Sequence, residues 1–166
     1  MNNERPKITL PMSAVEWAIE LGSVAILLLT FATLFIHFGD LPPRIPRHFS
    51  VGGTADGFGS KSEILVLPVI NLISFALLSW AQRVPHMHNF PYSLTAENVV
   101  RQYKNSIHLL RTVKVLIAIV FFYITYATVE TALGRSNGLS PFFVPAMLVT
   151  LLFTIIFFVT RGYRLR

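Results

Sequence analysis

Residues 41–61, LPPRIPRHFSVGGTADGFGSK, separate two long apolar runs, and this arrangement decides the fold. The stretch contains three prolines and the pair Asp56-Gly57. Proline removes a backbone donor, and glycine permits the turns that a helix does not allow. We therefore expect this loop to have a shape of its own outside a bilayer, between two membrane-spanning helices.

The composition places the whole chain in a membrane. Of its 166 residues, 53% are apolar and only 13% are charged, which is far from the usual balance of a soluble domain. The length suits one membrane domain, residues 1–166. The chain has no cysteine, so disulfides, thiolate metal sites and cysteine nucleophiles are excluded.

Four segments approach the roughly 20 residues that a helix needs to cross a bilayer. We expect an all-α integral membrane protein with spans at about 17–38, 64–81, 112–130 and 139–160. The segment 39–63 is then a structured extracytoplasmic loop. The segment 82–111 is cytoplasmic and includes an amphipathic helix before the third span.

The distribution of Lys and Arg predicts the orientation. The two tails and residues 83–114 contain 10 of these residues, whereas the other two loops contain 4. By the positive-inside rule, both termini are cytoplasmic. Trp17 and Trp80 fall at the cytoplasmic ends of their spans, where indoles favour the interface. The basic residues flank apolar segments and form no groove-reading motif, so we expect no nucleic-acid partner.

The cytoplasmic segment before the third span has two parts. Residues 83–93 contain two prolines and should be extended. Thr95 can then cap an amphipathic helix that continues into the third span. On one face of this helix we predict an interfacial basic stripe that contacts the bilayer. The stripe contains Arg101, Lys104 and Arg111, together with His108.

Polar and proline residues within the spans suggest how the helices pack. Asn71 is the best candidate for an interhelical hydrogen bond. Pro68 and Pro145 lie one to two turns inside the expected spans. We expect both helices to kink there and to open a vestibule under the loop.

Within the loop, Leu41, Ile45 and Phe49 are predicted to be apolar pegs that seat an extended chain on the bundle. Asp56 can accept backbone N–H groups or pair with Lys61, Arg44 or Arg47. At the end of the loop, Ser60 or Lys61 can satisfy the start of the second span.

The chemistry available to the loop is limited. Imidazole and carboxylate groups can bind zinc, and several lie on the outer side: His37, Asp40, His48 and Asp56. Their spacing matches no recognised ligand pattern, so we predict no metal site and no cofactor. Glu130 can pair with Arg135, Arg44 or Arg47, or form a proton relay with His37. We find no Ser/His/Asp arrangement, no P-loop and no HExxH, and we predict no catalytic residues.

The pattern LPxxIPxHF, followed by DGxGSK and a proline in the next span, resembles a bacterial membrane domain of unknown function. That domain occurs in the Sdp toxin immunity protein and its relatives. The segment PHMHNFPYSLTAENVVRQY resembles a small-protein branch of the same family. The resemblance implies a bacterial cytoplasmic (inner) membrane protein with the loop outside. In the immunity protein, the implied role is protection against a secreted toxin and relay of its presence to a membrane-held regulator.

We take the motif loop as the candidate binding site. Its candidate residues are Pro42, Ile45, Pro46, His48, Phe49, Asp56 and Lys61. The expected function is non-catalytic recognition of a peptide or protein partner, in a sensing, immunity or regulatory role. Two alternatives stay open. One is an accessory subunit of a larger membrane complex, and the other is a metal-assisted membrane enzyme or small transporter.

Overall fold

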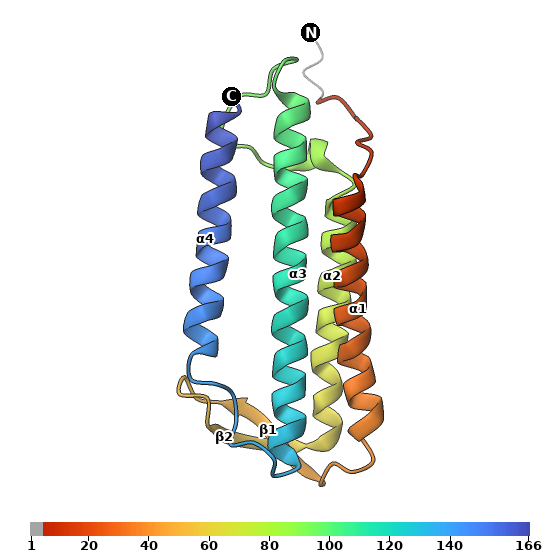
Figure 1. The fold of residues 1–166 in the computed structure, drawn as a ribbon, viewed down its shortest axis with the longest axis vertical. Helices are drawn as coiled ribbons and strands as arrows, with labels where there is room; N and C mark the ends of the chain where they lie inside the picture. Colours follow the sequence, from red (N-terminus) through yellow and green to blue (C-terminus); the bar gives the residue numbers. More distant parts are fainter. Residues whose placement is uncertain (1–4) are drawn as a thin grey trace.

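The computed structural model describes residues 5–166 as four long helices with a small β-hairpin at one end (Figure 1). Residues 1–4 of the expected domain lie outside this description. The helices are α1 (Ala14–His37), α2 (Val66–Ala81), α3 (Val99–Ala132) and α4 (Phe143–Arg164). By length and composition each can cross a membrane, if α2 is counted with the 3₁₀ turn η1 (Lys61–Leu65) before it. A four-span helical membrane architecture is confirmed.

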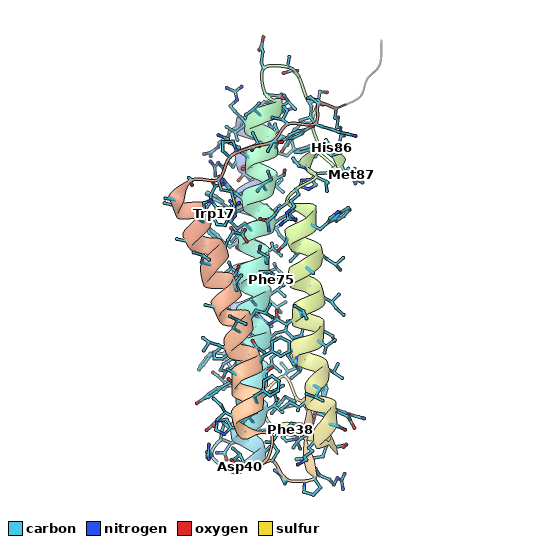
Figure 2. The ribbon with its side chains drawn as sticks, turned by 90° about the vertical axis from the view of Figure 1, so that its right-hand side faces the viewer. Trp17, Phe38, Asp40, Phe75, His86 and Met87 are labelled. Carbon is cyan, nitrogen blue, oxygen red and sulfur yellow. The ribbon has the colours of Figure 1, made fainter. Side chains whose placement is uncertain are left out.

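Helix α3 is the centre of the bundle. It packs against α1, α2 and α4, and α4 lies on the opposite side of α3 from α1 and α2 (Figure 1). The hairpin lies at one end of the bundle, which we call the hairpin end. The C-terminus lies at the other end, which we call the termini end, and Arg5 donates to His86 O there. Figure 2 shows Phe38 and Asp40 at the hairpin end, and Trp17 with His86 at the termini end.

Two helical segments begin with the same local device. Ser13 caps α1, and its backbone N–H donates to Glu16 Oε2 at 2.7 Å in a capping box. Ser60 caps η1 in the same way, with its N–H donating to Glu63 Oε1 at 3.0 Å. Each box satisfies N–H groups that have no partner inside the helix. The role expected of Ser60 at the start of the second span is confirmed.

The two prolines do not interrupt their helices. Pro68 is the third residue of α2, and Pro145 is the third residue of α4. The N–H groups of a first turn have no intrahelical partner, so proline there removes no hydrogen bond. Both prolines therefore lie in the first turn of an α-helix, and not deeper within it as expected.

The segment before the third span is confirmed as a helix continuous with that span. Residues 82–98 form turns around the 3₁₀ helix η2 (Pro85–Met87), and α3 then runs unbroken for 34 residues. Thr95 does act at its start, because Thr95 N–H donates to Asn98 Oδ1 at 2.9 Å and Asn98 N–H donates to Thr95 Oγ1 at 3.3 Å.

The loop between α1 and α2 contains a β-hairpin that the expected all-α spans did not include. Strands β1 (Arg44–Phe49) and β2 (Ala55–Ser60) pair antiparallel, with Ile45 opposite Gly59. The register is irregular between Pro46 and Phe49, as expected where a proline interrupts a ladder. The hairpin covers the end of the bundle.

Candidate functional site

The hairpin is fixed to the bundle by two of the three predicted apolar pegs. Leu41 and Ile45 are 4% and 2% exposed. They form one buried cluster with Leu34 of α1, Ile64 of η1 and Val129 of α3. Full burial of each such side chain contributes about 1.5–3 kcal/mol to stability. Three segments distant in sequence therefore hold β1 in place.

The tip of the hairpin is joined to the loop between α3 and α4. Leu139 N–H donates to Gly53 O at 2.8 Å, and Thr54 forms a β-bridge with Gly138. Gly53 has φ +87°, and a Cβ on it would overlap the backbone of Leu139. Glycine is thus required at this close approach. The hairpin is held at its base by the buried cluster and at its tip by this loop.

Two exposed ion pairs lie on the hairpin or beside it. His48 Nδ1 lies 2.5 Å from Asp56 Oδ1, and Arg47 Nη1 lies 3.6 Å from Glu63 Oε2. Asp56 therefore pairs with His48, and not with the basic residues considered from the sequence. Exposed pairs contribute about 0–1 kcal/mol, so these charges are available to an incoming group. No third His, Asp or Glu joins His48 and Asp56 within residues 5–166.

Lys61 and Pro42 lie at the base of the hairpin. Lys61 Nζ lies 5.1 Å from the centre of the Phe38 ring and 3.5 Å from Phe38 O. Its backbone N–H donates to Pro43 O at 3.1 Å. Lys61 therefore links the end of α1 to the start of η1. Pro42 is half-buried beside it.

A hollow of about 260 Å³ lies between β1 and the helices. Three candidate residues line it: Ile45, Pro46 and Phe49. The other walls come from η1, α2 and α3: Glu63, Ile64, Val66, Leu67, Ile124 and Thr128, with Arg47 at the β1 side. The third predicted peg, Phe49, thus lines a hollow and is not part of the buried cluster. Space does lie beneath the loop.

A second polar cluster, at the termini end, was missed from the sequence. Arg111 Nη1 lies 2.6 Å from Glu16 Oε1, and Arg111 Nε lies 2.9 Å from Glu20 Oε1. Lys114 pairs with Glu20, donates to Ser79 Oγ of α2 at 3.0 Å, and lies over the ring of Phe75. We call Glu16, Glu20, Arg111 and Lys114 the ion network. It joins α1, α2 and α3.

Only part of the predicted basic stripe is exposed, because Arg111 belongs to the ion network. Arg101 and Lys104 are exposed, whereas Arg111 is 4% exposed and faces α1. A sequence signal for the network existed. Glu16 and Glu20 lie four residues apart, and Arg111 and Lys114 three apart, so each pair shares one helix face.

Other predicted contacts are present in the bundle. Asn71 Nδ2 lies 3.5 Å from Thr30 Oγ1, and both side chains are buried between α2 and α1. Arg135 Nη1 lies 3.4 Å from Glu130 Oε1. Glu130, near the end of α3, therefore pairs with Arg135 in the loop that follows, as expected.

The region that carries the hairpin also matches a known family. Residues 25–72 match the family described as Domain of unknown function (DUF1648). An uncharacterized protein of Archaeoglobus fulgidus is 38% identical over 60 residues, which are 36% of this chain and 32% of that protein. The match thus spans about a third of the relative. No solved structure matches this chain.

The family match begins in α1, covers the whole hairpin and ends in α2. It excludes the first part of α1 as well as α3 and α4, and all four residues of the ion network lie outside it. The chain is therefore similar to a domain of unknown function in the part that forms the candidate site. The similarity extends to no named activity.

Proposed function

We propose that this chain is a non-catalytic membrane protein whose hairpin recognises a peptide or protein partner, in a sensing, immunity or regulatory role. The observation that carries the proposal is the form of the hairpin. It is anchored at the base by Leu41 and Ile45 and at the tip by Gly53, yet its charged face is exposed. A binding surface needs both properties, because groups held in place before binding lose less entropy in the complex.

The size of the hollow favours a side chain of a larger partner over a free small molecule. Its volume, about 260 Å³, is below the roughly 300–1,000 Å³ of pockets that enclose drug-sized ligands. Its walls are mostly apolar, with Arg47 and Glu63 among them. An apolar side chain that inserts here from a peptide would be flanked by charged groups able to orient its backbone.

Strand β2 offers a second means of contact. Within residues 5–166 the sheet has two strands, and β1 pairs with one edge of β2. Among these residues, the other edge of β2 has no partner strand in this sheet. Extended peptides commonly bind by adding a strand to such an edge. The exposed aromatic side chain of Phe58 lies on this strand, at 51% exposure. We propose that the partner contacts β2 and places a side chain in the hollow.

The cellular setting of this proposal follows from charge and resemblance. The distribution of basic residues supports a hairpin outside the cytoplasmic membrane and termini inside. The resemblance to the Sdp immunity family supports a secreted peptide as partner and a signalling or protective outcome. The exposed pair of His48 and Asp56 is then a surface that meets the partner, and we assign it no catalytic role.

Photo-crosslinking from single positions tests this proposal. A photoreactive amino acid replaces Phe58 on the hairpin or, as the control, Phe35, which is 83% exposed on α1 near the same end. In native membranes we expect discrete protein or peptide adducts from position 58 and lipid adducts from position 35. Adducts with the same proteins from both positions, or from position 35 alone, would refute hairpin recognition and favour an accessory subunit buried in a complex.

A further inference from the structure

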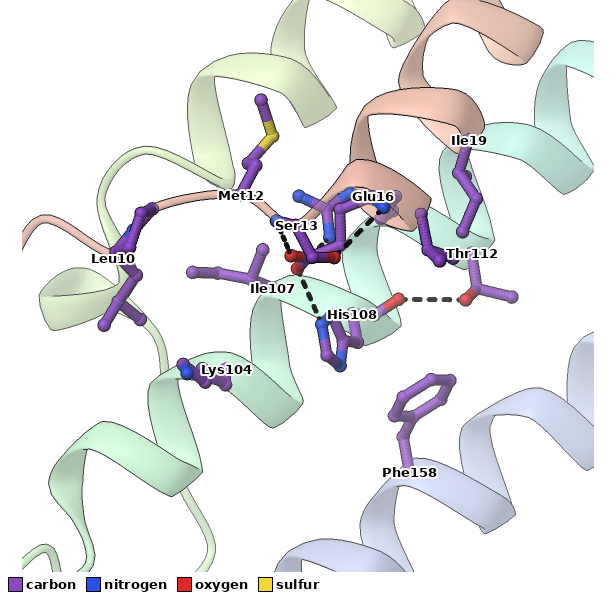
Figure 3. A pocket seen from close by; sticks show the side chains of 13 residues that line it. Leu10, Met12, Ser13, Glu16, Ile19, Lys104, Ile107, His108, Thr112 and Phe158 are labelled. Atoms are coloured by element: carbon purple, nitrogen blue, oxygen red, sulfur yellow. Dashed lines mark hydrogen bonds and ion pairs between the residues drawn. The ribbon is translucent and has the colours of Figure 1, made fainter.

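We propose that a cavity at the termini end binds an acidic phospholipid, with its phosphate near Lys104 and one acyl chain along α1 and α4. The cavity has a volume of about 480 Å³. It lies between the first turns of α1, the first half of α3 and Phe158 of α4 (Figure 3). This site is separate from the hairpin, and the inference does not depend on the proposed function.

The charge of the cavity favours an anion. The one carboxylate in its lining, Glu16, is already engaged by three groups. Ser13 N–H donates to it at 2.7 Å, His108 Nε2 lies 2.8 Å away, and Arg111 donates at 2.6 Å. Figure 3 shows Glu16 between Ser13 and His108, with dashed lines marking its interactions. The negative charge of Glu16 is therefore balanced within the protein.

Lys104 supplies the excess positive charge. It lines the cavity, is exposed, and takes part in no ion pair among residues 5–166. A lysine ammonium is a compact charge with three donors, which suits a phosphate group. Basic pockets between membrane helices are known sites for acidic headgroups.

The remaining walls suit an acyl chain. The apolar residues of the lining include Val15 and Ile19 of α1, Ile107 of α3 and Phe158 of α4. In Figure 3 the Phe158 ring extends from α4 towards His108 on α3. Both α1 and α4 pack on α3, and the cavity between them is lined by Ile19 of α1 and Phe158 of α4. A chain that enters beside Ile19 can follow this space into the bilayer.

The depth of the cavity matches the level of a headgroup. Glu16 in its lining precedes Trp17, whose side chain is 54% exposed near the end of a membrane-length helix. Tryptophan is enriched where the hydrocarbon meets the headgroups. The phosphate near Lys104 and the chain beside Ile19 are thus each placed in the layer of the bilayer that they prefer.

Native mass spectrometry of the full chain in mild detergent tests this site. The protein is mixed with phosphatidylglycerol or with phosphatidylcholine of the same acyl chains, and retained lipid is counted. We expect preferential retention of phosphatidylglycerol. The variant Lys104→Gln should weaken that retention about fivefold, the effect of removing one basic contact near a membrane surface. Arg101→Gln is the matched control, because Arg101 is equally exposed one turn away and does not line the cavity.

Two further arms make the outcome decisive. Ile19→Trp should reduce retention by occupying the place of the acyl chain, and the thermal midpoint of that variant shows whether it is folded. Inorganic phosphate should not displace the lipid, because it lacks the acyl chain. Equal effects of Lys104→Gln and Arg101→Gln, equal retention of both lipids, or displacement by inorganic phosphate would overturn the proposal.

Discussion

Lys114 of α3 is 1% exposed and forms an ion pair with Glu20 of α1, across 94 positions of the sequence. Arg111 extends the contact to Glu16. These four charges are balanced two against two, so the ion network places little net charge at the bundle interior. It fixes the position of α1 against α3 at the end opposite the hairpin.

The ion network should behave as a coupled unit. Glu20→Gln leaves Lys114 without its carboxylate partner, and breaking a buried pair in this way costs about 3–5 kcal/mol. Lys114→Met should also lower stability, because the two carboxylates of Glu16 and Glu20 then face the single guanidinium of Arg111. We expect the double variant to unfold at a higher temperature than either single variant in mild detergent. Additive losses in the double variant would show that the pair is not coupled.

The contact between the hairpin tip and Leu139 should require glycine at position 53 but not at position 52. Gly53→Ala forces a Cβ against Leu139 at a positive φ, whereas the nearest atom to a Cβ on Gly52 is an ordinary 3.7 Å away. We expect faster hydrogen exchange of the hairpin amides and of Leu139 N–H in Gly53→Ala. Gly52→Ala should exchange at the rate of the native chain. Equal rates in all three proteins would contradict the joined tip.

Helix α4 should be sensitive at Gly162. Its backbone carbonyl accepts a hydrogen bond from Gln102 Nε2 at 2.9 Å, and a Cβ on Gly162 would overlap the Tyr92 ring. We expect Gly162→Ala to lower the thermal midpoint. Gly22→Ala is the control, because a Cβ there meets nothing within 4 Å and alanine favours a helix by about 1 kcal/mol. A midpoint for Gly162→Ala at or above that of Gly22→Ala would refute this packing.

The orientation can be tested by labelling single cysteines, since the chain has none of its own. Thr54→Cys lies on the hairpin, and Ala96→Cys lies before α3 at the termini end. Both positions are exposed. In intact cells we expect a membrane-impermeant maleimide to label position 54 and to leave position 96 unlabelled until the cells are opened. The reverse pattern would place the hairpin inside.

The features that were predicted correctly depend on short, local stretches of the sequence. Apolar runs marked the four helices. Leu41 and Ile45 were identified as pegs because, with Phe49, they recur every four residues through a proline-rich stretch that cannot be helical. Asn71 was the one amide within its span, so an interhelical hydrogen bond was expected of it, and the structure gives Thr30 as the partner. The two strands of the hairpin were not predicted, because proline and glycine weaken the sequence pattern of a strand.

The missed features depend on contacts between distant segments or on helix boundaries. The pairing of Glu16 with Arg111 requires α1 to lie beside α3, which no local pattern states. Pro145 was placed in a second turn because the fourth span was expected from residue 139, whereas α4 begins at Phe143. That shift of four residues moves the proline into the first turn, where it does not bend the helix.

The most direct test of recognition by the hairpin is to fill the hollow beneath it and measure crosslinking from position 58. Ile124→Trp places a large side chain in the hollow, whereas Ile119→Trp, on the exposed side of α3, is the control. Thermal midpoints establish that both variants are folded. We predict that partner adducts are lost in Ile124→Trp and retained in Ile119→Trp. Undiminished adducts in folded Ile124→Trp would contradict insertion of a partner side chain beneath the hairpin.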